Sequence, residues 1–254
     1  NRPFRPFFPD FLKLFSQIFI LSFLIVSIYY MNILVISLND SKRLSKLNYE
    51  YTKIDADDWS NTQPIIKGKM VRKFKEGQKH FNSKCGCFSS HYKTYKYIVE
   101  NKLNNVIICE DDAILDCGED FENIGKKRTI RTIMDELKNG GKITLLGAKL
   151  LHPTNYRKEF VAKDVKLHDG LNTIDKTKFR WSGTWAIFYP TWESVNEIIK
   201  EIEKPTTKLN HMDLWLCKKG FITDLFYPSV FTHNDGGTSA FGIKRKIFKN
   251  YLAI

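Results

Sequence analysis

The stretch Val106–Ala113, with the sequence VIICEDDA, decides how this chain folds. Its first four residues are apolar, which is typical of a short strand buried on both faces. Three acids, Glu110, Asp111 and Asp112, follow without a break. Adjacent carboxylates repel one another unless a cation offsets their charge, and oxygen ligands at the C-terminal end of a strand suit Mg²⁺ or Mn²⁺ bridging a diphosphate. An ordinary acidic loop is the alternative from this stretch alone.

Apolar runs and amphipathic segments alternate on both sides of this strand. The predicted strands are Ile33–Leu38, Val106–Cys109, Ile143–Leu146 and Trp185–Tyr189, and the predicted helices are His91–Asn101, Arg128–Leu137 and Trp192–Ile202. Turns or loops are predicted at Gly140-Gly141, Gly183 and Gly236-Gly237. This alternation favours an α/β fold with a largely parallel central sheet flanked by helices.

The first 30 residues form a hydrophobic N-terminal segment of different composition. Residues 14–30 carry no charge over 17 positions, the lower end for a membrane-spanning helix, and Arg2, Arg5 and Lys13 before them would leave the N-terminus in the cytoplasm. A buried strand is predicted directly after Met31, which could itself be the natural start. A membrane anchor and an upstream extension therefore both stay open, and the expected location is the cytoplasm or the membrane. Residues 31–254 are expected to form one catalytic domain.

Charge and cysteine usage narrow the classes of function. The net charge of +12 allows a basic nucleic-acid-binding protein, but the lysines are interleaved with acids from Lys42 to Lys249, and there is no zinc-finger spacing or RNP-type motif. A solvated basic surface, also suited to an anionic ligand, is the simpler interpretation. The five cysteines form no CxxC pair, so buried free thiols in a reducing compartment are expected.

A second block, Cys85–His91 with the sequence CGCFSSH, precedes the acidic strand. Together the two blocks resemble glycosyltransferase family 25, which includes lipooligosaccharide and procollagen galactosyltransferases and has the pattern Gly-Cys-x-x-Ser-His, a helix, and a strand ending in Glu-Asp-Asp. The matching positions are Gly86, Cys87, Ser90, His91, Glu110, Asp111 and Asp112. The resemblance runs from Met31 to about Ser239. The chain departs from the family pattern at Lys84, Ser37 and Ile187. These departures affect how a donor and an acceptor would fit more than they affect the fold.

This resemblance implies a GT-A-type nucleotide-diphospho-sugar transferase fold and a metal-dependent activity. The implied reaction moves a hexose, galactose or glucose, from a UDP-sugar to a hydroxyl of a glycan, a lipooligosaccharide or a protein, with inversion. The implied cofactor is Mn²⁺ or Mg²⁺. A non-catalytic relative that only binds glycans is an alternative, motivated by Lys84 and Ser37.

The resemblance also implies roles for individual residues. Residues 36–43 look like the family's opening strand and Arg-containing turn, and residues 53–56 like its second strand and acidic turn. The expected donor-binding residues are Leu38, Asn39, Arg43, Asp55, Glu110 and Asp111. The expected metal ligands are Asp112, Glu110 and His233. Imidazole suits Mn²⁺, and the Gly-rich loop after His233 could approach a diphosphate closely.

A carboxylate near the acceptor hydroxyl would serve as general base. Asp213 is the candidate, because it is a polar residue in an otherwise apolar segment; a helix N-cap is the alternative. His91 is expected to open a helix and to pack or cap locally. Trp181, Trp185 and Trp215 could stack on a sugar, although core packing is expected for at least one of them.

Overall fold

The computed structural model describes residues 32–57, 65–71, 79–115, 130–151, 167–175, 180–209, 211–227 and 229–233. All of them belong to the compact unit Asn32–Ile254. The predictions about residues 14–30, Gly236-Gly237 and Ser239 lie outside the described residues. Among the residues that are described, no helix combines the length and the apolar character needed to cross a bilayer.

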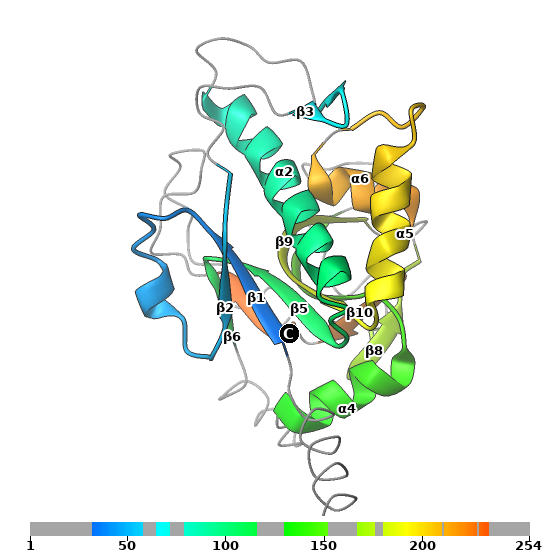
Figure 1. Cartoon of the computed structure of the whole chain (residues 1–254). Coiled ribbons are helices and arrows are strands. Elements are labelled where there is room, and N and C mark those ends of the chain that lie inside the picture. Colours follow the sequence, from blue (N-terminus) through cyan, green and yellow to red (C-terminus); the bar gives the residue numbers. More distant parts are fainter. Residues whose placement is uncertain are drawn as a thin grey trace, which may run out of the picture. The chain divides into compact units, whose positions relative to one another are not determined.

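A seven-stranded sheet forms the centre of this unit, in the order β2-β1-β5-β9-β7-β10-β8 (Figure 1). Its strands are β1 (Asn32–Ser37), β2 (Thr52–Asp55), β5 (Val106–Glu110), β7 (Thr144–Leu151), β8 (Gly170–Thr173), β9 (Arg180–Tyr189) and β10 (Asp224–Tyr227). β1 is parallel to both β2 and β5, and β7 is parallel to β10. β9 is antiparallel to both β5 and β7, so β2, β1, β5, β7 and β10 share one direction. The predicted α/β class with a largely parallel sheet is confirmed.

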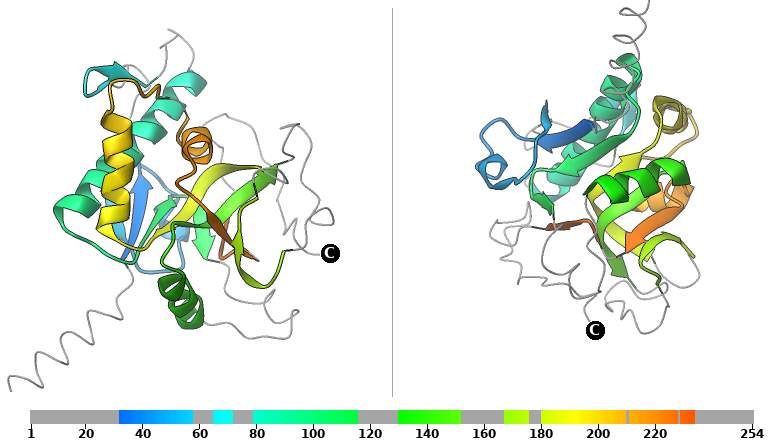
Figure 2. Two further views of the ribbon diagram at one scale, coloured as in Figure 1. Left: turned by 90° about the vertical axis from the view of Figure 1, so that its right-hand side faces the viewer. Right: turned by 90° about the horizontal axis from the view of Figure 1, so that it is seen from below.

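Helices pack against this sheet through the apolar sides that their sequences provide. They are α2 (Lys79–Glu100), α4 (Ile130–Gly140), α5 (Trp192–Glu203) and α6 (Met212–Lys219). α2 and α5 lie side by side, α2 also contacts β1 and α6, and α6 packs on β9 (Figures 1 and 2). The shared core includes Phe88 and Ile98 of α2, Ile198 of α5 and Ile108 of β5, all fully buried.

Two short pairings and a single 3₁₀ turn complete the described elements. β11 (Phe231–His233) is antiparallel to β6 (Ala113–Leu115), and β3 (Ile65–Ile66) is antiparallel to β4 (Lys69–Met70). The turn η1 (Leu44–Lys46) follows β1. β6 begins directly after the acidic turn 111–112, so β11 is brought beside that turn.

Two local predictions are wrong. His91 lies inside α2 rather than at its start, because the preceding serines do not cap: the Ser90 hydroxyl donates to the carbonyl of Gly86 one helical turn back, and the Ser89 hydroxyl donates to Asp57. Gly183 lies inside β9 rather than in a turn, with φ of +87°. Glycine adopts a positive φ without steric cost. Gly183 therefore allows this backbone conformation within the strand and does not reverse the chain.

Candidate functional site

The ends of β1 and β5 place the residues after β1 beside the acidic turn. Ile36 is paired with Glu110, so the next residue of β1, Ser37, lies beside Asp111. The Ser37 hydroxyl donates to Asp111 Oδ2 at 3.0 Å, and the Ser41 hydroxyl donates to the same oxygen at 2.6 Å. Asp111 thus fixes the loop after β1 at the C-terminal edge of the sheet.

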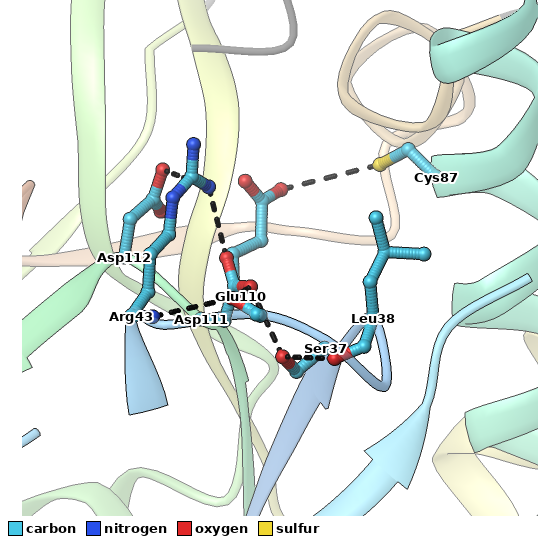
Figure 3. A network of polar contacts seen from close by, with 8 residues as sticks. Ser37, Leu38, Arg43, Cys87, Glu110, Asp111 and Asp112 are labelled. Atoms are coloured by element: carbon cyan, nitrogen blue, oxygen red, sulfur yellow. Dashed lines mark hydrogen bonds and ion pairs between the residues drawn. The ribbon is translucent and has the colours of Figure 1, made fainter. Parts of the chain in front are cut away.

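Arg43 from this loop joins two of the three acids (Figure 3). Its Nη1 donates to Asp111 Oδ1 at 3.0 Å and to Asp112 Oδ2 at 3.3 Å. Burial alone would lower the pKa of Arg43, but the charges of Asp112 and Asp111 outweigh it, and the pKa is raised. Asp112 itself is only 7% exposed. The turn therefore already gathers oxygen ligands around a positive charge, which is the donor set that Mg²⁺ or Mn²⁺ takes.

The side chain of Glu110, the third acid, contacts β9 and α2. Its Oε1 accepts a hydrogen bond from the hydroxyl of Thr184 on β9. The same oxygen lies 4.0 Å from Cys87 Sγ on α2, and Figure 3 shows this contact. The side chains of the three consecutive acids are therefore divided between two sets of partners. Asp111 and Asp112 converge on Arg43, and Glu110 faces the helix.

Residues 31–178 match the family model described as glycosyltransferase family 25 (LPS biosynthesis protein). The chain belongs to glycosyltransferase family 25. The match includes the two sequence blocks, the end of β1, Arg43 and the acidic turn, whereas Asp213 and His233 lie beyond it. A search of curated proteins found no match to this family 25 chain.

The predicted donor-binding residues of this family 25 protein follow the same edge of the sheet. Leu38 directly follows β1 and is 41% exposed, and its carbonyl accepts from the Ser37 hydroxyl at 3.1 Å. Asp55 ends β2 and is paired with Ser37. Lys53 Nζ donates to Asn39 Oδ1 at 2.8 Å and pairs with Asp55 at 2.7 Å. The hydrogen bond from Lys53 lowers the pKa of Asp55.

A pocket of about 560 Å³ adjoins this edge between β2 and α2. Its lining is largely polar and of mixed charge, with aromatic rings from α2, and includes Lys53, Asp55, Asp57, Tyr92, Lys93 and Tyr97. Tyr92, Lys93 and Tyr97 lie in the helix that was predicted from His91, but no site role was predicted for them. The sequence signal for these residues is their spacing. Lys96 follows Tyr92 by four residues and Lys93 by three, so all three lie on one side of a helix.

His233 is brought to the acidic turn by its backbone. In the β6–β11 ladder His233 is paired with Ala113, the residue that directly follows Asp112. β11 also packs on β7, where a Cβ added at Gly147 would lie 2.6 Å from the carbonyl oxygen of Phe231. A glycine at this position is what allows β11 to approach so closely.

Asp213 lies in the first turn of α6, and the N-cap is His211 rather than Asp213. Its Oδ2 accepts from the backbone N–H of Gly183 at 3.0 Å, and its Oδ1 accepts from that of Leu214 at 2.7 Å. The carboxylate is partly exposed and joins α6 to β9. Of the three tryptophans, Trp181 and Trp215 are buried in the core, and Trp185 is partly exposed.

His91 and Cys87 face Glu110 from α2, and neither was predicted from the sequence to bind a metal. His91 is 1% exposed, and burial lowers its pKa to about 4, so its imidazole is neutral. Burial also raises the pKa of the Cys87 thiol, and the charge of Glu110 raises it further. Their separation of four residues, which places both on one face of a helix, is the signal that could have found them.

Proposed function

We propose that this family 25 glycosyltransferase transfers a hexose, galactose or glucose, from a UDP-sugar to a hydroxyl of a glycan, a lipooligosaccharide or a protein, in a metal-dependent and inverting reaction. The observation that carries the proposal is Arg43, which is fixed by Asp111 and Asp112 at the C-terminal ends of β1 and β5. In open α/β sheets, ligands bind outside the carboxyl ends of the strands. A guanidinium held there can donate to diphosphate oxygens in the bidentate geometry that suits phosphate.

The acidic turn fits a divalent cation, with Asp112 and His233 as the ligands we propose. Asp112 is a buried carboxylate already beside a positive group, and the backbone of His233 lies opposite the next residue. When bound, Mn²⁺ or Mg²⁺ would offset the negative charge of the departing diphosphate. Asp111 orients Arg43 in this proposal, with the support of Ser37 and Ser41. Asp55 and Glu110 are proposed to bond the donor's ribose, Glu110 through Oε2, while its Oε1 keeps the hydrogen bond from Thr184.

Asp213 is proposed as the general base. Each of its carboxylate oxygens accepts one backbone N–H, so each keeps further lone pairs that can accept a proton. The acceptor oxygen would form a bond to the anomeric carbon as the carbon–diphosphate bond breaks, and the hydroxyl proton would pass to Asp213. Attack on the face opposite the diphosphate inverts the anomeric centre. A positioned base contributes about 100- to 10,000-fold to such a step.

The test is turnover of nucleotide sugars by the purified full chain. UDP-galactose and UDP-glucose are incubated with the protein in Mn²⁺, in Mg²⁺ or in EDTA, and release of UDP is measured. One donor is expected to turn over with metal, and Asp112→Asn is expected to lose at least about 100-fold of that activity. Asp135→Asn, an exposed acid on α4, is the control and should match the wild type. Turnover that persists in EDTA and in Asp112→Asn would overturn the proposal.

Membrane association through residues 14–30 stays a prediction that is separate from this test. Donor binding has a second readout, because a ligand that binds only the folded state raises the melting temperature. A metal-dependent rise with one UDP-sugar and none with ADP-sugars would support a uridine donor.

A further inference from the structure

Three side chains with different ligand chemistry meet beside the acidic turn. Cys87 and His91 are four residues apart on α2 and lie on one face of that helix. Glu110, at the end of β5, faces them. A ligand atom of each residue, Cys87 Sγ, an imidazole nitrogen of His91 and a carboxylate oxygen of Glu110, lies within 4.8 Å of the other two.

His91 is the observation that points to a ligand. Its side chain is 1% exposed, and within the described part of the chain neither Nδ1 nor Nε2 has a hydrogen-bond partner. A buried polar group without a hydrogen-bond partner destabilises the folded state, and imidazole has two such nitrogens. A buried, unpartnered imidazole directed at a thiol and a carboxylate is explained if one of its nitrogens binds a cation.

We propose that Cys87, His91 and Glu110 bind a zinc-type divalent cation. On binding, the Cys87 thiol would release its proton to solvent; the resulting thiolate and the carboxylate together carry −2, which matches the charge of the ion, and the neutral imidazole adds none. The thiolate is the ligand that selects zinc over Mg²⁺, Ca²⁺ or Mn²⁺, which favour oxygen ligands, and imidazole also suits zinc. Three protein ligands leave a fourth position open on the ion.

The distances fit a site that closes slightly on binding. Zinc lies about 2.0–2.3 Å from such ligands, so tetrahedral ligand atoms are roughly 3.3–3.8 Å apart. Atoms within 4.8 Å of one another reach this arrangement by small side-chain rotations. The Thr184 hydroxyl, which donates to Glu110, is placed to orient the carboxylate as an outer hydrogen-bond partner.

This site is distinct from the cation position proposed at Asp112. Glu110 is directed toward α2, whereas Asp111 and Asp112 are directed toward Arg43. An ion held by Cys87, His91 and Glu110 would join α2 to the end of β5 and so fix the strand that carries the acidic turn. The inference does not depend on the transferase activity, because binding of the ion alone can be measured.

Co²⁺ is the probe, since it takes zinc sites and reports its ligands by absorption. The metal-free full chain is titrated with Co²⁺ without any nucleotide sugar. We expect one equivalent to bind with a thiolate-to-cobalt charge-transfer band and four-coordinate ligand-field bands, and we expect Zn²⁺ to displace it. Cys87→Ser should remove the charge-transfer band, and His91→Gln should weaken binding at least about 10-fold.

Cys217→Ser is the matched control, because Cys217 is a partly exposed thiol on α6 outside the cluster; it should keep the band. Circular dichroism checks that each variant is folded, and Glu110→Gln serves as a third variant if Cys87→Ser does not fold. Absence of a thiolate band in the wild type, or its persistence in Cys87→Ser, would overturn the proposal. Loss of Co²⁺ binding in Asp112→Asn with full binding in Cys87→Ser would place the ion at the acidic turn instead and would also overturn it.

Discussion

Asp213 accepts a hydrogen bond of 3.0 Å from the backbone N–H of Gly183, 30 residues earlier in the chain. This bond ties the first turn of α6 to β9, and β9 also carries Thr184, which donates to Glu110. The carboxylate proposed as the general base is therefore held by the same strand that contacts the acidic cluster. Its chemical role and its structural role can be separated by substitution.

Asp213→Asn should lower hexose transfer by about 100- to 10,000-fold, because an amide cannot take up the acceptor proton. The amide oxygen still accepts one backbone N–H, so the melting temperature should fall only slightly. Asp213→Ala, which loses both acceptors, should be less stable than Asp213→Asn. Initial rates at saturating donor and thermal melting measure the two effects. Near wild-type turnover in Asp213→Asn would remove this residue from the chemistry.

Arg43→Ala should destabilise the fold and make its stability depend on divalent cations. Without the guanidinium, Asp111 and Asp112 lose the cation between them, at a cost of about 1–3 kcal/mol in unfolding free energy. Millimolar Mg²⁺ or Mn²⁺ should recover part of that loss, and more than it adds to the wild type. Denaturant unfolding with and without the ion tests this.

Lys200→Ala is the control for that experiment, because its pair with Glu197 is exposed on both sides. Such surface pairs contribute about 0–1 kcal/mol. Equal cation responses of Arg43→Ala and Lys200→Ala would contradict the prediction.

Gly147→Ala should destabilise the β7–β11 contact. The added Cβ would lie 2.6 Å from the Phe231 carbonyl oxygen, a backbone atom that can move only with β11. We expect a cost of about 1–3 kcal/mol and weaker donor binding, because β11 pairs with the strand after the acidic turn. Gly140→Ala is the matched control: its Cβ would meet the flexible end of Leu171 at 2.8 Å, so it should cost less. Comparable unfolding free energies for the two variants would argue against this role of Gly147.

Glu201 should stabilise the fold in a pH-dependent way. Hydrogen bonds from Lys204 and Lys219 lower its pKa from 4.5 to about 2. Because the folded pKa lies below the unfolded one, the stabilisation is present above about pH 4.5 and is lost as the pH falls toward 2. Glu201→Gln should therefore be less stable than the wild type by up to about 1 kcal/mol at pH 7, with the gap narrowing in acid. Glu197→Gln is the control, and a gap that does not change with pH would contradict the assignment.

The elements with strong periodicity were predicted closely. The strand expected at Val106–Cys109 ends one residue later, and the helix expected at Trp192–Ile202 also ends one residue later. The N-terminal half of α2 was missed. Its sequence contains Gly86, Ser89 and Ser90, which disfavour a helix in isolation. Burial of Phe88 in the core and local hydrogen bonding of the serines stabilise the helix there.

The sequence by itself determined the α/β class, the family and the position of the acidic turn, because a buried strand and a block of consecutive acids are local features. Only the tertiary structure decided which partners each of those acids contacts. The chain turns at residues 111–112, so neighbouring carboxylates face different partners: Asp111 and Asp112 meet Arg43, and Glu110 meets α2 and β9. Side-chain direction after a turn depends on which strands and helices pack around it, and that packing is set by contacts between residues far apart in the chain.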